Sequence, residues 1–204
     1  HDGAEKEARL VDLVLSGQAD GVLLLNGYVP RGPVRSMTES QAPVVAVSVP
    51  SSDEVPAVLV REREAAAAVA RHLLELGHRS FGYVTGPAAN YVEQERWAGF
   101  RDALATAGIA EAAIRRYPGD FRVDTGVAAG RAFLAEAARP SAVFAVSDEM
   151  AIGFMRAVRV GGLDVPRDLD GTSLDHALVP EGRGVYFECF NGAENFGWSP
   201  LVGW

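Results

Sequence analysis

The chain has 204 residues, of which 48% are hydrophobic and 23% charged, and its formal net charge at pH 7 is −8. This composition excludes disordered and collagen-like chains, and the length is enough for one large domain or two small lobes. Because the negative charge comes without any dense run of Lys and Arg, these residues are not expected to hold a nucleic-acid backbone themselves.

The sequence has no apolar run near the ~18 residues that cross a bilayer. Its first ten residues, HDGAEKEARL, lack the pattern of a secretory signal. The single cysteine, Cys189, cannot form a disulfide within the chain, which agrees with a reducing compartment. We therefore expect a cytoplasmic protein.

Short apolar runs alternate along the chain with stretches of helical spacing. Each run has the length of a strand that is buried on both faces. The predicted strands are 21–25, 43–49, 57–60, 80–85 and 142–146. Apolar residues at helical spacing predict helices around 8–15, 69–76, 97–104 and 151–158. This alternation is typical of an α/β fold with a mostly parallel sheet and right-handed crossovers.

The segment 73–86, LLELGHRSFGYVTG, indicates a tight connection from a helix to a strand. Gly77 is expected to end the helix with a positive φ, which costs least in a residue without Cβ. His78 and Arg79 then place positive charge near the negative end of the helix. Loops at the far, carboxyl ends of such strands are where ligands of open α/β sheets usually bind.

After Leu169 the alternation ends. The remaining residues contain glycines every few positions and isolated aromatics, without a sustained helical or strand period. They are not assigned to any element.

The sequence lacks the motifs of several enzyme classes. No GxGxxG or GxxxxGK[ST] motif for a nucleotide phosphate occurs. The four histidines lack the paired spacing of a zinc site. There is no GxSxG motif, and Cys189 has no recognisable base as a partner. We therefore expect no catalytic residue, no metal and no cofactor.

Polar and aromatic side chains follow several predicted strands. Taken singly, each has a structural explanation, such as a turn, a surface ion pair, a core plug or a helix cap. Together at one edge they would form a polar cleft with an aromatic platform, which suits a small hydroxylated ligand. The candidates are Asn26, Tyr28, Glu64, Arg96, Phe121, Ser147 and Asp148.

Several motifs occur in the order of a known family. They are HLLELGHRSFGYVTGP (72–87), ERWAGFRDALATAGI (95–109), PGDF (118–121) and RPSAVFAVSDEMAIGFMRAVRVGGLDVPRDL (139–169). They closely resemble the effector-binding core of the LacI/GalR family of bacterial transcription regulators, over about residues 1–169. The resemblance implies an α/β, two-lobed fold of the periplasmic-binding-protein type (type I), with a sugar or related metabolite in the cleft between two parallel-sheet lobes.

On this resemblance we expect three parts in the chain. Residues 1–78 form the first lobe, which lacks the family's first strand and first helix, and residues 79–170 form the second lobe. Residues 171–204 depart from the family pattern, and we expect that they do not form its usual return crossover.

The resemblance also implies roles for single residues. Arg96, in an R-x-x-G-F motif, matches an arginine that hydrogen-bonds the effector, and its forked guanidinium suits that role. Asn26 matches a polar cleft residue, and Phe121 matches an aromatic position after G-D. Glu64 falls where some members place a ligand-contacting carboxylate. Ser147 replaces an Asn or another small polar residue.

Two more residues belong to this expected site. Asp148 is expected to cap the helix that follows it. Tyr28 is expected to be a position where a change retunes ligand specificity.

The resemblance implies partners as well. We expect a homodimer, and contact with operator DNA only through an N-terminal helix-turn-helix domain that these residues do not include. Two other interpretations stay open: a solute-binding protein of a sugar transporter, which shares the two-lobed fold, and an enzyme built on the same layers.

Overall fold

The computed structural model describes Leu13, residues 16–25, 43–48 and 55–163, and the backbone of residues 170–173 and 186–187. The chain divides into two compact units. Unit 1 comprises residues 1–60 and 90–92, and unit 2 comprises residues 61–89 and 93–204. The helix predicted at 8–15 lies outside the described residues, apart from Leu13.

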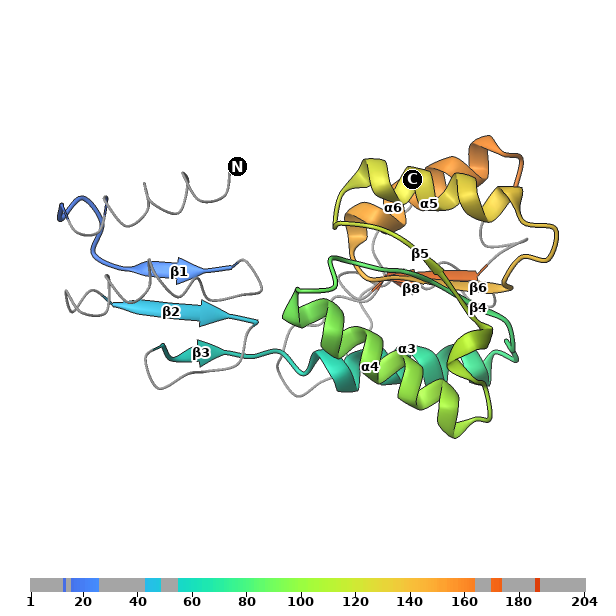
Figure 1. The fold of residues 1–204 in the computed structure, drawn as a ribbon, viewed down its shortest axis with the longest axis horizontal. Coiled ribbons are helices and arrows are strands. Elements are labelled where there is room, and N and C mark those ends of the chain that lie inside the picture. Colours follow the sequence, from blue (N-terminus) through green and yellow to red (C-terminus); the bar gives the residue numbers. More distant parts are fainter. Residues whose placement is uncertain are drawn as a thin grey trace. The chain divides into compact units, whose positions relative to one another are not determined.

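Unit 1 contains a parallel three-stranded sheet, sheet A. The three predicted strands form it, although the third is shorter than expected. Leu24, Val44, Ala46 and Val55 are the buried residues of its small core. In spatial order the strands are β1 (Val22–Leu24), β2 (Val44–Val47) and β3 (Ala57–Val58) (Figure 1).

Unit 2 contains a second parallel sheet, sheet B, so the predicted α/β architecture is confirmed. Its last two strands come from the segment to which the sequence assigned no element, which corrects that expectation in part: the backbone of the tail extends the sheet. In spatial order the strands are β5 (Ile114–Tyr117), β4 (Phe81–Val84), β6 (Ala142–Ala145), β7 (Asp170–Ser173) and β8 (Tyr186–Phe187).

Helices cover both faces of sheet B (Figure 1). On one face lie α3 (Glu62–Glu75) and α4 (Tyr91–Thr106), and on the other lie α5 (Val123–Ala135) and α6 (Asp148–Val160). A short 3₁₀ helix (Glu111–Ala113) precedes β5. None of the described helices is long and apolar enough to span a membrane.

The core of unit 2 contains interlocking aromatic rings. The ring of Tyr83 packs on that of Phe144, with centroids 5.3 Å apart, and Phe144 packs on Phe100 at 5.1 Å. Burying a side chain of this size contributes roughly 1.5–3 kcal/mol relative to leaving it in water. Helix α3 packs its apolar stripe, including Val69 and Leu73, into the same core.

The packing of α3 explains why the units divide where they do. Since its buried face belongs to the core of unit 2, the boundary falls after Val60. The sequence placed the boundary between the lobes after His78, at the turn that ends this helix.

The turn at Gly77 has the predicted geometry. Gly77 has φ +92°, the N–H of His78 donates to the carbonyl of Leu73 at 3.1 Å, and α3 ends. The guanidinium of Arg79 donates to the carbonyl of Leu74 at 3.1 Å, so a cation satisfies the negative end of the helix.

Helix α5 and strand β5 of unit 2 were not predicted either. Helix α5 contains Gly126 and Gly130, which lower helix propensity. Both face α6: a Cβ at Gly126 would overlap the backbone of Met150, and one at Gly130 would lie 2.7 Å from the Cβ of Ala157. Strand β5 has the sequence IRRY, in which two exposed arginines separate the buried ends, so it forms no apolar run.

Candidate functional site

Three loops meet at one edge of sheet B, because β4, β5 and β6 are parallel neighbours and end on the same side. We call this the carboxyl edge and define it as residues 85–96, 118–124 and 146–149. Four predicted site residues lie on it: Arg96, Phe121, Ser147 and Asp148.

Arg96 joins three elements at this edge. It is 8% exposed, and its Nε donates to Oε2 of Glu62 at 2.6 Å in a buried ion pair. Its Nη1 donates to the carbonyl oxygen of Val146 at the end of β6. Since Ser147 follows directly, the structure brings Arg96 and Ser147 to the same place.

The R-x-x-G-F motif has a structural explanation. Gly99 packs against the backbone of Arg63 on α3, where a Cβ would overlap the carbonyl group of that residue. This close approach of α4 to α3 places Arg96, one turn earlier, beside Glu62. Phe100 is fully buried in the aromatic core and anchors the same turn.

The carboxylate beside Arg96 is Glu62, which the sequence interpretation missed. Glu62 is 5% exposed, whereas the predicted Glu64 has a side chain 70% exposed and pairs with Arg61 at 3.6 Å. Helical periodicity could have identified Glu62 as the buried carboxylate. Glu62 lies seven residues before the buried Val69 and therefore on the apolar stripe of α3, whereas Glu64 lies off that stripe. A ligand contact by Glu64 stays a prediction.

Phe121 is held in an unusual backbone conformation. Its φ is +68°, in the left-handed region that non-glycine residues seldom adopt. Its ring lies against the backbone that follows β4, since a Cβ at Gly86 would lie 2.6 Å from the Cζ of Phe121. Phe121 also lines an open groove of about 680 Å³ along α5 and α6, together with Arg131 and Arg156.

A buried carboxyl, Glu93, fixes the loop after β4, and sequence reasoning missed it as well. Glu93 is 3% exposed, and its Oε2 accepts hydrogen bonds from the N–H of Gly86 at 2.8 Å and the hydroxyl of Tyr83 at 3.3 Å. Burial raises the pKa of Glu93 to about 7. Burial, followed by the nearby Glu93 carboxylate, raises the pKa of Tyr83 well above its usual value.

The expected helix cap is wrong by one residue. The N-cap of α6 is Ser147, whose extended backbone (φ −142°, ψ 159°) lets its hydroxyl accept from the N–H of Met150 at 3.4 Å. Asp148 is the first residue of the helix itself. Its charge still lies at the positive end of the helix dipole.

The other predicted residues of the site, Asn26 and Tyr28, lie outside the described residues. Within the part of the chain that the structure describes, no group of three or more His, Cys, Asp or Glu side chains is placed to hold a metal ion.

The fold agrees with a known family. Residues 70–181, more than half of the chain, match the periplasmic binding protein-like domain family, and the chain belongs to it. Within that family, the relatives described next identify this chain as an effector-binding core of the LacI/GalR type.

Two curated relatives are transcription regulators. Catabolite control protein A of Priestia megaterium is 30% identical over 177 residues, which cover 86% of this chain and 53% of the relative. The HTH-type transcriptional repressor PurR of Edwardsiella ictaluri is 30% identical over 179 residues, covering 86% and 52%. The chain thus spans about half the length of the curated relatives it matches.

Solved structures show the same fold. A LacI-family transcriptional regulator from Burkhoderia phymatum superposes with a TM-score of 0.75 at 25% identity, covering 84% of this chain and 62% of that one. A LacI-family regulator from Enterococcus faecium, solved with bound ribose, has a TM-score of 0.73 at 23% identity, covering 80% and 61%. The names of PurR and of the Burkhoderia phymatum protein describe transcription regulators, which favours an effector-binding core over the two alternatives that the sequence left open.

Proposed function

We propose that this chain is the effector-sensing core of a LacI-type transcription regulator, and that it binds a sugar or a related small metabolite at the carboxyl edge. Binding changes the protein's grip on operator DNA through a helix-turn-helix domain outside these residues. A regulator of transcription works where the DNA is, so the proposal includes the predicted cytoplasmic location.

The observation that carries the proposal is the placement of Arg96. The guanidinium holds several donors in fixed geometry, and its contacts bring it beside Ser147 at the end of β6. Phe121 lies at the same edge and offers a ring face for the C–H surface of a sugar. Asn26, Tyr28 and Glu64 complete the proposed set, as predictions.

A homodimer is part of the same proposal. The groove along α5 and α6 carries the apolar Val123 and Val127 together with charges of both signs, such as Glu149 and Arg156. A surface of this kind can match itself across a two-fold axis. Light scattering on the purified protein checks the dimer, and a monomer at working concentration contradicts it.

The effector site is tested by a thermal-shift screen of the purified chain against monosaccharides, disaccharides, sugar phosphates, nucleosides and nucleobases. A ligand that binds only the folded state raises the melting temperature, and the rise grows with the logarithm of its concentration relative to Kd. We expect Arg96→Ala to abolish the shift produced by the active compound class, while far-ultraviolet circular dichroism stays native-like below the melting temperature.

Two further variants separate binding from folding. Arg96→Lys keeps a cation beside Glu62 but loses the fork, so it should fold and bind weakly. Arg63→Ala removes an arginine whose 2.6 Å pair with Asp102 is largely exposed, and its affinity should equal that of the wild type. Unchanged affinity in Arg96→Ala would remove Arg96 from the site.

A further inference from the structure

The charged residues of the carboxyl edge narrow the class of ligand. Within the three segments that define the edge there are two arginines and six acidic residues. The arginines are Arg96 and Arg122, and the acidic residues are Glu93, Glu95, Asp120, Asp124, Asp148 and Glu149.

Both arginines of the edge already hold a carboxylate. Arg96 pairs with Glu62 at 2.6 Å, and both side chains are buried. Arg122 pairs with Asp124 at 3.0 Å on the surface. A second anion at Arg96 would place two negative groups on one buried guanidinium, and the loss of hydration would then lack compensation.

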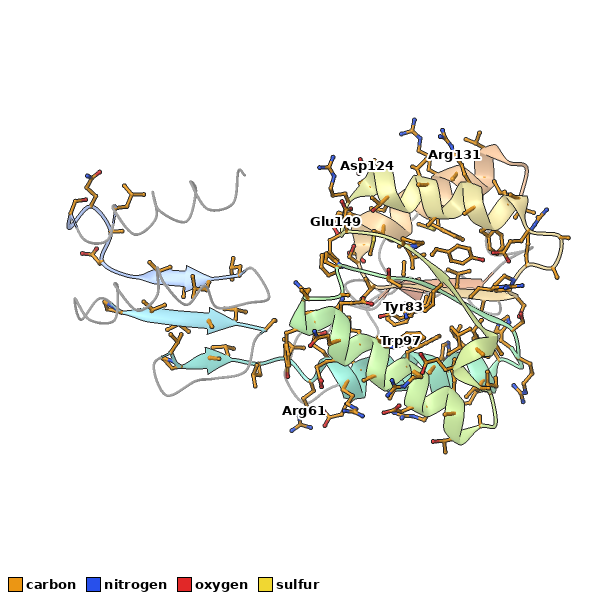
Figure 2. All side chains as sticks on the ribbon, viewed as in Figure 1. Arg61, Tyr83, Trp97, Asp124, Arg131 and Glu149 are labelled. Atoms are coloured by element: carbon orange, nitrogen blue, oxygen red, sulfur yellow. The ribbon has the colours of Figure 1, made fainter. Side chains whose placement is uncertain are left out.

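The helix ends at this edge are occupied in the same way. Helix N-termini attract anions because their N–H groups are unpaired and their dipoles point outward. Helix α5 has Asp124 in its first turn, and α6 has Asp148 and Glu149. The acidic residue in the first turn of α4 is Glu93, whose buried carboxyl already accepts the N–H of Gly86. Figure 2 shows Asp124 and Glu149 at the same end of the α5–α6 pair.

The chemistry of these groups favours hydroxyls. An ionised carboxylate only accepts hydrogen bonds, so a ligand must bring donors to it. A sugar hydroxyl donates to a carboxylate and can also accept from a guanidinium. A phosphate monoester or carboxylate ligand brings additional acceptors and additional negative charge.

We propose that the ligand of this site is an uncharged, hydroxylated compound, and that the buried Glu62 is the residue that excludes phosphorylated and carboxylate ligands by occupying Arg96. This inference rests on the proposed function and deepens it. Glu62 then acts as a specificity-determining residue through Arg96, in addition to any stabilisation it provides.

Cations elsewhere in unit 2 do not change this conclusion. Arg131 and Arg156 line the groove of α5 and α6, and Arg131 lies further along α5 than Asp124 (Figure 2). Arg116 lies over the ring of Trp97, with its Cζ 4.5 Å from the ring centroid. Arg131 and Arg156 share their groove with Asp124 and Glu149 of the carboxyl edge, whereas Glu62 and Arg96 do not line it, so the preference proposed for Arg96 concerns a different part of the edge.

The test measures binding by calorimetry with matched pairs of probes on the full chain: ribose and ribose 5-phosphate, glucose and glucose 6-phosphate, and inorganic phosphate alone. The variants are Glu62→Gln, which removes the charge but keeps an acceptor for Arg96, and Glu75→Gln as the control, because Glu75 is an exposed residue at the other end of α3. Wild type and Glu75→Gln should bind a neutral member more tightly than its phosphorylated partner.

Glu62→Gln should shift that preference towards the phosphorylated member by roughly tenfold or more, the size of one charge-assisted hydrogen bond. It should also acquire stabilisation by inorganic phosphate that wild type and Glu75→Gln lack. Circular dichroism confirms that each variant is folded at the temperature of the titration.

The outcomes separate the two proposals. Tighter binding of phosphorylated members by wild type overturns this inference and leaves the proposed function standing. An equal phosphate response in wild type and Glu62→Gln also overturns it, because a different cation then binds the anion. If no sugar of either kind binds wild type, the proposed function fails, and the phosphate response of Glu62→Gln still decides whether Glu62 excludes anions.

Discussion

The two faces of sheet B are covered by helix pairs that are held together differently. On one face, α3 and α4 meet at Gly99 and are joined by the ion pairs of Glu62 with Arg96 and of Arg63 with Asp102. On the other face, α5 and α6 meet closely at Gly126, Gly130 and Gly153.

The two helix pairs illustrate two ways in which a fold can fix the positions of helices beside a site: close steric contact and a buried ion pair. Glycine contacts set a distance by steric overlap alone, so the packing of α5 on α6 depends little on pH or salt. Burying two charges costs desolvation free energy, and their mutual attraction offsets this cost only while both partners are present. The face with the ion pairs carries Arg96, and the face with the glycine contacts carries α5 and α6, which follow β5 and β6 in the chain.

The largest effect is expected from breaking the buried pair. Glu62→Ala leaves the Arg96 guanidinium buried without its carboxylate, and it should lower the free energy of unfolding by about 3–5 kcal/mol. Urea denaturation measures this loss. Asp102→Ala breaks the exposed pair between the same two helices and should cost less than about 1 kcal/mol. Equal losses in the two variants would contradict the distinction.

A smaller, pH-dependent effect is expected at Glu93. Its folded pKa of about 7 lies above the ordinary value of 4.5, so folding favours the protonated form. The resulting stabilisation is fully present below pH 4.5 and is lost as the pH rises through 7. Relative to Glu93→Gln, the wild type should lose on the order of 3 kcal/mol across this window.

Denaturation of both proteins at a series of pH values checks this result. The groups that face Glu93 are Tyr83 from β4, Arg116 from β5 and Arg96 from its own helix. Since the two proteins differ only at position 93, the difference between their pH profiles isolates Glu93. Parallel pH profiles for wild type and Glu93→Gln would contradict the raised pKa.

The smallest of the three effects is expected on the glycine face. In Gly153→Val the new side chain would overlap the carbonyl group of Val123, and the strain should cost about 1–3 kcal/mol. Thermal melting measures it. Ile152→Val changes the half-exposed neighbouring residue and should stay within about 0.5 kcal/mol of wild type.

Much of unit 2 could be predicted from sequence because its signals are local. Apolar runs predicted β4 and β6, and Gly77 with Arg79 predicted the end of α3. Helix α5 was missed because its glycines lower helix propensity and are explained only by their contacts with α6. Strand β5 was missed because its two arginines interrupt the apolar pattern.

The site shows the same limit. Arg96 was found through a motif, but its partner Glu62 and the neighbouring Glu93 were not, because buried charges look like surface charges in a sequence. Their burial is indicated only by their positions on the apolar faces of the helices. Glu62 shares a face with Val69 on α3, and Glu93 shares one with Phe100 on α4. Reading charged residues by helical phase could have identified both.

The contact between Gly86 and Phe121 places a constraint on sequence divergence. A Cβ at position 86 would lie 2.6 Å from the Cζ of Phe121 and 3.3 Å from Oε2 of Glu93. A lineage that gains a side chain at position 86 must therefore give up the aromatic ring at 121 or move the loop that carries it. The two positions, 35 residues apart in the chain, are expected to covary, so this pair should distinguish subgroups of relatives that share the fold but differ in the shape of the carboxyl edge.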